Sequence, residues 1–210
     1  MEFILVRHAL PLRVENSDTI ADPSLSPIGL EQARRLADWL GCEPINRIVS
    51  SPKRRAVETA SPLAEVLGLA VEVIQEFSEI DRSSGTYIPV EELRKENHPI
   101  YQKMKARQWD DLGYMDPETF WKEVQTAFVR LQENCQEDDT VVVVSHGGTV
   151  NAITTHVIEL GTMFFFEPAY TSITRLRTNN WTGTLRLATL NETTHLHALR
   201  DQLEPLSEAC

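Results

Sequence analysis

Two short apolar stretches of the chain each lead into a histidine. The first, Glu2–Val6, runs straight into Arg7 and His8. The second, 141–145, runs into His146. Short apolar runs rich in β-branched residues are typical of buried parallel strands, and ligands of open α/β sheets bind beyond the carboxyl ends of such strands. A single strand-end histidine would be explained by hydrogen bonds to loop carbonyls, but two such strands favour one shared site.

Histidine at such a site can act as a nucleophile towards phosphorus. One ring nitrogen must then be free while the other is held as a hydrogen-bond donor. Phosphoryl transfer also needs positive groups around the non-bridging oxygens. Arg7 adjoins His8, and Arg54 and Arg55 lie in the first turn of a predicted helix, where backbone amides also favour anions. These residues predict a positive site for a phosphoryl group.

The remaining parts of such a site follow the third and fourth predicted strands. A leaving oxygen needs a proton, and Glu79, which comes after the third strand, is placed to supply it. Gly147 and Gly148 come directly after His146, and a glycine backbone can approach a phosphate closely.

The charge of the whole chain is opposite to that of the predicted site. The chain has 31 acidic residues and 20 lysines and arginines, which gives a net charge of −11. This balance argues against nucleic acid and anionic membranes as partners, so local positive charge must attract an anionic substrate. No apolar run approaches the ~20 residues of a membrane helix, and the N-terminus lacks the pattern of a signal peptide. Cys42, Cys135 and Cys210 are scattered, which indicates reduced thiols in a cytoplasmic protein.

An alternation of strands and helices positions the candidate residues. Two predicted helices, after Ser26 and Ser51, begin with a serine followed by a proline, the pattern of a capped start. The order β-α-β-α-β implies parallel pairing with right-handed crossovers, so we expect an α/β fold, a three-layer α/β/α sandwich with a mostly parallel sheet. Predicted strands cover 2–6, 47–50, 71–74, 141–145, 171–177 and 184–190, and predicted helices cover 27–40, 52–67 and 149–160.

The segment from about 78 to 137 differs from the rest of the chain. It is rich in aromatic residues and predicts three helices, at 90–97, 100–109 and 118–131. We expect it to be a helical cap that is inserted between sheet strands and overhangs the site, within a single domain covering 1–210. Most of its aromatic side chains are expected to form the core of the helical layer.

Ordered sequence blocks along the chain carry a resemblance to a known family. The stretch Leu5-Val6-Arg7-His8 is similar to the signature of the histidine phosphatase superfamily, which has the phosphoglycerate mutase-like fold. One arginine–histidine pair would be a weak signal, whereas blocks in the right order across nearly the whole chain are a strong one. The other matching blocks are 25–33, 50–60, 77–80 and 144–148, and 191–196 resembles the family's closing strand.

The resemblance implies a role for each candidate residue. His8 would be the residue that is phosphorylated during turnover. Arg7, Arg55 and His146 would bind the transferring phosphoryl group. Glu79 would be the proton donor and then the base.

The same motifs also distinguish between the two adjacent arginines and indicate a backbone contact at Gly147. Of the two adjacent arginines, Arg55 matches the family's arginine by its place before Ala56, which leaves Arg54 as a solvated helix residue. Gly147, directly after the second histidine, is expected to contact the substrate through its backbone.

The chain departs from the family's pattern just after His8. Ala9 stands where the family usually has glycine, and Pro11 and Val14 stand where polar residues are common. The missing phosphate contacts are either lost or supplied by Asn16 or Ser17. These departures leave the phosphoryl core intact and bear on the identity of the substrate.

A second histidine pair lies near the end of the chain. His195 and His197 are two residues apart, which in a strand would put both on one face and could suggest a metal. No carboxylate or cysteine completes a ligand set with them. We therefore expect one packed and one hydrogen-bonded histidine, and neither a metal nor a cofactor.

The sequence favours a metal-independent phosphomonoester hydrolase that acts through a phosphohistidine on His8. The first alternative is phosphoglycerate mutase-type phosphoryl transfer, but mutases of the family usually carry paired arginines in the cap, and here the basic residues of the cap are spread among acids. The second alternative is a non-catalytic phosphoprotein-binding module, which would not require an acid such as Glu79. The expected partner is a small phosphorylated metabolite, not nucleic acid or a membrane, and the protein is expected to be a monomer or a homodimer.

Overall fold

The computed structural model describes residues 1–15 and 17–199, and its described strands form a single sheet. The strands are β1 (Glu2–Arg7), β2 (Arg47–Ser50), β3 (Val71–Val73), β4 (Thr140–Ser145), β5 (Ile173–Thr178) and β6 (Leu185–Glu192). Their order in the sheet is β3-β2-β4-β1-β5-β6. The first four strands in this order run parallel, whereas β5 is antiparallel to β1 and β6 is antiparallel to β5. The predicted, mostly parallel α/β sheet is confirmed.

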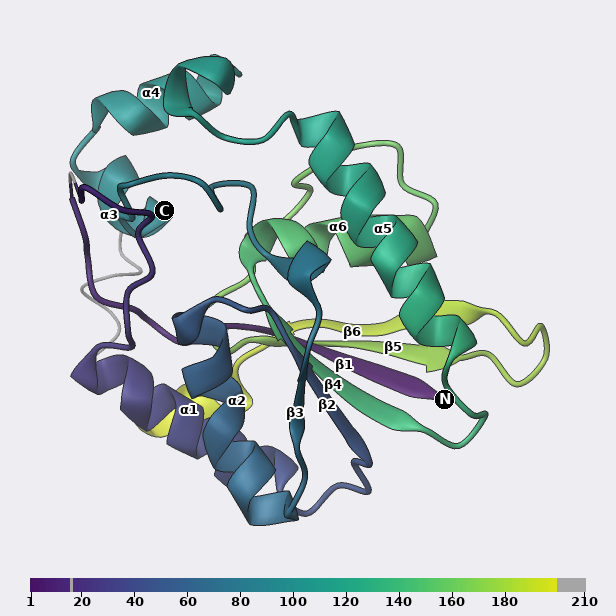
Figure 1. Cartoon of the computed structure of the whole chain (residues 1–210). Helices are drawn as coiled ribbons and strands as arrows, with labels where there is room; N and C mark the ends of the chain where they lie inside the picture. Colours follow the sequence, from purple (N-terminus) through teal and green to yellow (C-terminus); the bar gives the residue numbers. More distant parts are fainter. Residues whose placement is uncertain (16, 200–210) are drawn as a thin grey trace.

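Helices cover both faces of the sheet, as the predicted three-layer sandwich requires. On one face lie α1 (Pro27–Leu40) and α2 (Arg54–Leu67). On the other lie α5 (Pro117–Glu133) and α6 (Gly147–Val157). Figure 1 shows the sheet enclosed between these two helix pairs.

The central strand β1 is buried on both of its faces. Ile4 and Val6 pack into the core under α1 and α2, while Phe3 and Leu5 pack into the core under α5 and α6. All four side chains are fully buried, and burial of such a side chain contributes about 1.5–3 kcal/mol. The strand that leads to the predicted site is therefore held firmly from both sides.

The two serine–proline helix starts behave differently. Ser26 caps α1 as predicted, because its Oγ accepts a hydrogen bond from the backbone N–H of Gly29 at 3.1 Å. Ser51 does not cap α2, so that prediction is wrong: α2 begins later in the chain, and its N-cap residue makes no side-chain cap bond. The hydroxyl of Ser51 lies instead 2.7 Å from Nε2 of His146, because neighbouring strands β2 and β4 bring the two residues together.

The predicted insertion is divided between two places. Its first helices, α3 (Val90–Lys95) and α4 (Pro99–Lys105), lie beyond the carboxyl ends of the parallel strands (Figure 1). Its last helix, α5, packs on the sheet, where Phe120 and Phe128 are fully buried in the core. The overhanging part is thus shorter than the predicted 78–137, because α5 has an apolar face that belongs to the sheet.

The loop after β1 is held by the start of α1. The backbone N–H of Leu10 donates to Oε1 of Gln32 at 2.8 Å, and its carbonyl accepts from the N–H of Ser26 at 2.9 Å. Gly29 lies so close that a Cβ there would be 2.1 Å from the carbonyl oxygen of Leu10. This close approach fixes the chain directly after His8.

We expect Gly29→Ala to lower the free energy of unfolding by about 1–3 kcal/mol, because the backbone of Leu10 must move to admit a methyl group. Chemical denaturation measures the change. Gly161→Ala is the matched control, since a Cβ at Gly161 meets nothing within 4 Å and should cost less than about 0.5 kcal/mol. Equal effects of the two substitutions would show that the close approach is not a constraint.

Candidate active site

A pocket of about 470 Å³ lies at the carboxyl ends of the parallel strands, beneath α3 and α4. His146 is fully buried and lies behind this lining, with its ring centroid 5.1 Å from that of His8. The fold therefore brings the strand-end residues of distant segments together. The predicted site residues that line the pocket are Arg7, His8, Arg55, Glu79 and Gly147.

His8 is buried in a geometry that defines its tautomer. Its Nδ1 lies 2.8 Å from the carbonyl oxygen of Ala9, which can only accept, so Nδ1 carries the hydrogen. Its Nε2 accepts a hydrogen bond from Nε of Arg55 at 3.3 Å. Burial, followed by the charges of Arg55 and Arg7, holds the pKa of His8 well below its ordinary value. The imidazole is thus neutral at neutral pH, with the lone pair on Nε2, as a nucleophile requires.

The two adjacent arginines are the first two residues of α2, and their side chains have different surroundings. Arg55 is 1% exposed, with its guanidinium 4.4 Å from the ring centroid of Tyr87 and its Nη2 3.7 Å from Oδ1 of Asp81. The side chain of Arg54 is 60% exposed and pairs with Glu58 at 3.4 Å. Of the pair, the structure brings only Arg55 to His8.

His146 is linked to the second strand through Ser51. Oγ of Ser51 accepts from the N–H of Lys53 at 3.3 Å, lies 2.7 Å from Nε2 of His146, and can donate its own hydrogen to that nitrogen. Nδ1 of His146 then carries the ring hydrogen. Among the described residues, neither this Nδ1 nor Nη2 of Arg55 has a hydrogen-bond partner, although both atoms are buried. Burial, followed by the charge of Arg55, also lowers the pKa of His146 well below its ordinary value.

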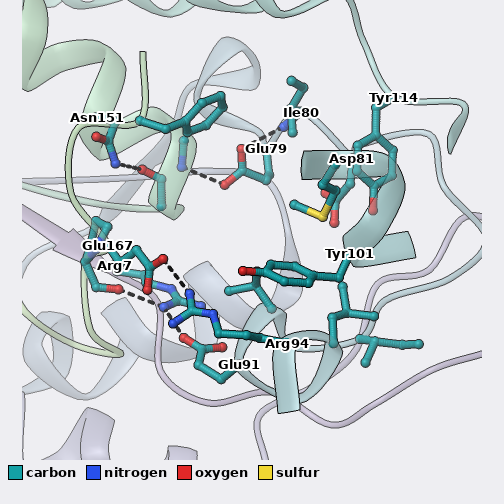
Figure 2. Close-up of a pocket in the computed structure, with 18 of the residues that line it drawn as sticks. Arg7, Glu79, Ile80, Asp81, Glu91, Arg94, Tyr101, Tyr114, Asn151 and Glu167 are labelled. Atoms are coloured by element: carbon teal, nitrogen blue, oxygen red, sulfur yellow. Dashed lines mark hydrogen bonds and ion pairs between the residues drawn. The ribbon is translucent and has the colours of Figure 1, made fainter. Parts of the chain in front are cut away.

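Glu79 is held by two backbone amides. Its Oε1 accepts from the N–H of Ile80 and its Oε2 from the N–H of Gly148, both at 2.8 Å (Figure 2). Burial raises the pKa of the Glu79 carboxyl, and the nearby Asp81 raises it further. A Cβ at position 148 would lie 2.3 Å from Oε1 of Glu79, so any larger residue there would displace the Glu79 carboxyl from this position. The arrangement therefore favours a Glu79 carboxyl that stays protonated at pH values above the ordinary range for a carboxylic acid.

Arg7 is clamped by groups that come from the other end of the chain and from the inserted helices. Its Nη1 donates to Oε1 of Glu91 and to the carbonyl of Pro168, both at 2.7 Å (Figure 2). Its guanidinium lies 3.8 Å from the ring centroid of Tyr170, whose hydroxyl donates to Oε2 of Glu91 at 3.0 Å. Both hydrogens of Nη1 are used, so the clamp fixes the plane of the guanidinium.

The charge of the pocket is mixed, which corrects the expectation of a simply positive site. Arg7 faces Glu91, and Arg55 lies near Asp81, so each of the two arginines already has a carboxylate beside it. Recognition of a phosphoryl group here depends on placed hydrogen-bond donors more than on net charge. The acidic residues that line the pocket are Glu79, Asp81, Glu91 and Glu167, and the basic ones are Arg7, Arg55, Arg94, Lys105 and Arg107.

Several residues that hold the site were missed from the sequence. Glu91 and Tyr170 follow no strand-end motif and lie far from Arg7 in the chain, so no local pattern marks them. Tyr87 lies in the aromatic-rich segment without a distinguishing neighbour. Ser51 was predicted as a helix cap, and its place in a matching sequence block was the signal that could have identified it.

Of the two candidates in the loop after β1, the structure describes only Ser17. Asn16 lies outside the described residues. Ser17 does not line the pocket. Its backbone N–H donates to the carbonyl of Gly85 at 3.0 Å. Val14 and Tyr87 exchange two backbone hydrogen bonds of 2.8 and 2.7 Å, which tie this loop to the segment before α3.

His195 and His197 lie in a 3₁₀ helix, η3 (Thr194–Leu199), so the spacing that would put both on one face of a strand does not do so here. His195 is buried with its Nε2 3.4 Å from Oγ1 of Thr171, whereas His197 is exposed. Within residues 1–15 and 17–199, no group of three or more histidine, cysteine or acidic side chains could hold a metal ion.

Comparison with known proteins identifies the family. The family model described as histidine phosphatase superfamily (branch 1) matches residues 3–192. The chain belongs to the histidine phosphatase superfamily. Phosphoserine phosphatase 1 of Hydrogenobacter thermophilus is 31% identical to this phosphatase over 154 residues, which cover 70% of this chain and 71% of that protein.

Solved structures share the fold of the phosphatase. Phosphoserine phosphatase from Entamoeba histolytica, in complex with 3-phosphoglyceric acid, aligns with a TM-score of 0.70 and 25% identity over 93% of this chain and 98% of its own. Mycobacterial glucosyl-3-phosphoglycerate phosphatase aligns with a TM-score of 0.70 and 22% identity over 92% and 99% of the two chains. With the family match, these relatives make the chain a phosphomonoester hydrolase of the histidine phosphatase type, and they favour this activity over the mutase and phosphoprotein-binding alternatives. In the described part of the chain, no helix has the length and apolarity to cross a membrane.

We expect Glu91→Ala to lower kcat by about 10–100-fold, because Arg7 loses a charged hydrogen bond that fixes its position. KM should change less, since removal of a carboxylate from the pocket also removes its repulsion of a phosphate. Steady-state hydrolysis of nitrophenyl phosphate measures both constants. Glu92→Ala is the control, because Glu92 is on the same helix but pairs with Arg13 at the surface. A similar kcat for the two variants would contradict the clamp.

Proposed function

We propose that the phosphatase hydrolyses small phosphate monoesters without a metal ion, through a phosphohistidine on His8. One observation carries the proposal: the buried side-chain atoms without hydrogen-bond partners in the described part of the chain include Nη2 of Arg55 and Nδ1 of His146, and both belong to side chains that adjoin the unprotonated Nε2 of His8. Buried polar atoms without partners are costly, and the oxygens of a phosphoryl group would satisfy both.

In the first step, Nε2 of His8 forms a bond to phosphorus while the bond from phosphorus to the ester oxygen breaks. The bonding pair leaves with that oxygen. Arg7, Arg55 and His146 hold the non-bridging oxygens and stabilise the charge that they carry in the transition state. Glu79 gives its proton to the leaving oxygen, so the alcohol departs neutral.

In the second step, a water attacks the phosphorus of the phosphohistidine and Glu79 takes its proton. The bond between nitrogen and phosphorus breaks, its electron pair returns to Nε2 of His8, and inorganic phosphate leaves. The backbone of Gly147, at the N-terminus of α6, adds a helix-end environment that favours an anion. The substrate class of a small phosphorylated metabolite is supported by relatives named as phosphoserine phosphatases. The cytoplasmic location and the monomeric or homodimeric state stay predictions.

Rapid-quench labelling should place phosphate on His8 during turnover. The label should be stable in alkali and lost in acid, and mass spectrometry should map it to the peptide that follows β1. Turnover should persist in excess chelator. Label on a serine or a carboxylate would contradict the mechanism, as would a loss of activity that a divalent ion restores.

The adjacent arginines provide a matched pair for the same experiment. Arg55→Ala should slow phosphorylation of His8 by about 100–1,000-fold, because a donor to the transferring group is lost. Arg54→Ala should remain within a few-fold of the wild type, since that side chain is exposed. The reverse pattern would show that the wrong arginine has been assigned.

We expect Glu79→Gln to slow the first step strongly for alkyl phosphates and weakly for nitrophenyl phosphate, because nitrophenolate leaves without a proton. Single-turnover rates on the two substrates separate this step from breakdown of the phosphohistidine. Because burial raises the pKa of Glu79, the wild type should keep the acid form at pH values above the ordinary carboxyl range and lose it as pH rises through the raised pKa. Equal losses on the two substrates in the first step would show that Glu79 is not the acid.

A further inference from the structure

The pocket has a second, apolar part beyond the phosphoryl site. Its outer wall comes from two segments, the one that contains α4 and the residues after it, and the loop between α6 and β5. At about 470 Å³, the pocket is as large as those that enclose whole organic ligands, roughly 300–1,000 Å³. The apolar and aromatic residues of this outer wall include Tyr101, Trp109, Tyr114, Met163, Phe164 and Phe166.

Phe164 joins the two segments of the outer wall. Its ring centroid lies 6.3 Å from that of Trp109 and 5.1 Å from that of Trp121, which is anchored in the core. Its backbone has a φ of 51°, a conformation that bulky residues rarely adopt. The side chain nevertheless stays 42% exposed at the pocket. The fold thus keeps an aromatic surface open towards the space where the group attached to the phosphate must lie.

Two ion pairs lie at the outer pocket, and Nε of Arg94 is buried without a hydrogen-bond partner among the described residues. Arg94 forms an ion pair with Glu167 across the opening (Figure 2), and Glu91 is bound to Arg7. A phosphorylated amino acid would bring an ammonium, which would have to displace Arg7 from Glu91 or Arg94 from Glu167. Lys105 and Arg107 also line the pocket, but both are exposed, where water and salt screen their charge.

From these contacts we infer that the preferred substrate is a phosphate monoester whose alcohol carries a large apolar, aromatic group, which binds against Phe164 and Trp109. The inference rests on the proposed function, because it takes His8 as the point at which the phosphoryl group is held. The paired charges make a small zwitterionic ester a poorer fit to the same space.

The test compares 3-phenylpropyl phosphate with propyl phosphate and phosphoserine. The first two esters have primary alkyl alcohols as leaving groups, so they differ mainly in the apolar group and not in chemical reactivity. We expect kcat/KM for the phenylpropyl ester to exceed that for the propyl ester by about tenfold or more, as burial of a phenyl ring predicts. Phosphoserine should be hydrolysed no better than propyl phosphate. Equal values for the first two esters, or a preference for phosphoserine, would overturn the inference.

Substitutions in the outer wall test whether the apolar group of the substrate binds there. Phe164→Ala should lower the ratio of the phenylpropyl to the propyl ester several-fold, chiefly through a higher KM for the phenylpropyl ester. Trp181→Ala is the control, since this side chain is 96% exposed in the turn between β5 and β6, away from the pocket, and the ratio should not change. A ratio that Phe164→Ala leaves unchanged would remove this wall from the binding site.

A binding measurement separates this inference from the proposed mechanism. In His8→Ala, calorimetry should show tighter binding of 3-phenylpropylphosphonate than of propylphosphonate. Preference in binding without any phosphohistidine in the wild type would leave the inference standing and the mechanism refuted. Phosphohistidine formation in the wild type, with no preference for the phenylpropyl compound in either kinetics or binding, would support the mechanism and refute the inference.

Discussion

The contact between Arg55 and His8 is the interaction on which the rest of the site depends. A guanidinium that is 1% exposed has lost nearly all of its water, and its compensation comes from the ring of Tyr87 and from Asp81 at 3.7 Å. Burial of the imidazole, followed by this neighbouring positive charge, holds the pKa of His8 well below its ordinary value and keeps the ring neutral. The hydrogen bond from Nδ1 to the carbonyl of Ala9 then decides which nitrogen is free.

The sheet brings the two histidines together through its register. In the parallel pair of β1 and β4, Arg7 lies opposite Ser145, so His8 and His146 leave the sheet side by side. Because β1 is buried between two cores, its register with β4 is fixed. A slip by one residue would turn each core side chain of β1 to the wrong face of the sheet. The geometry of the site is thus a direct result of how the apolar side chains of one strand alternate.

The sequence predicted those parts of the site that lie at the ends of strands. Apolar runs followed by His8 and His146 are local patterns, and the parallel fold that they imply brings strand ends to one edge. The clamp on Arg7 could not be predicted in this way, because Glu91 and Tyr170 lie 84 or more residues from it in the chain and no periodic pattern links them.

Local patterns also gave wrong or incomplete answers where tertiary contacts decide. Ser51 and the proline that follows it have the pattern of a helix cap. The hydroxyl of Ser51 nevertheless lies 2.7 Å from Nε2 of His146, because the neighbouring strands β2 and β4 end side by side. The end of the predicted insertion was misplaced for a similar reason: α5 has an amphipathic pattern that fits a cap or a sheet layer equally well, and only its packing with the sheet distinguishes them. His195 and His197 show that a spacing of two says nothing about a strand once the chain turns into a 3₁₀ helix.

The clamp on Arg7 also joins two events that could otherwise occur separately. Glu91 is part of α3, and the carbonyl of Pro168 belongs to the loop that forms the opposite edge of the pocket. Any motion that widens the entrance by moving α3 away from the strand ends therefore removes the partner that orients Arg7. The position of α3 and the orientation of Arg7 are thus coupled, so the electrostatic environment at the floor of the pocket depends on how α3 lies over the strand ends.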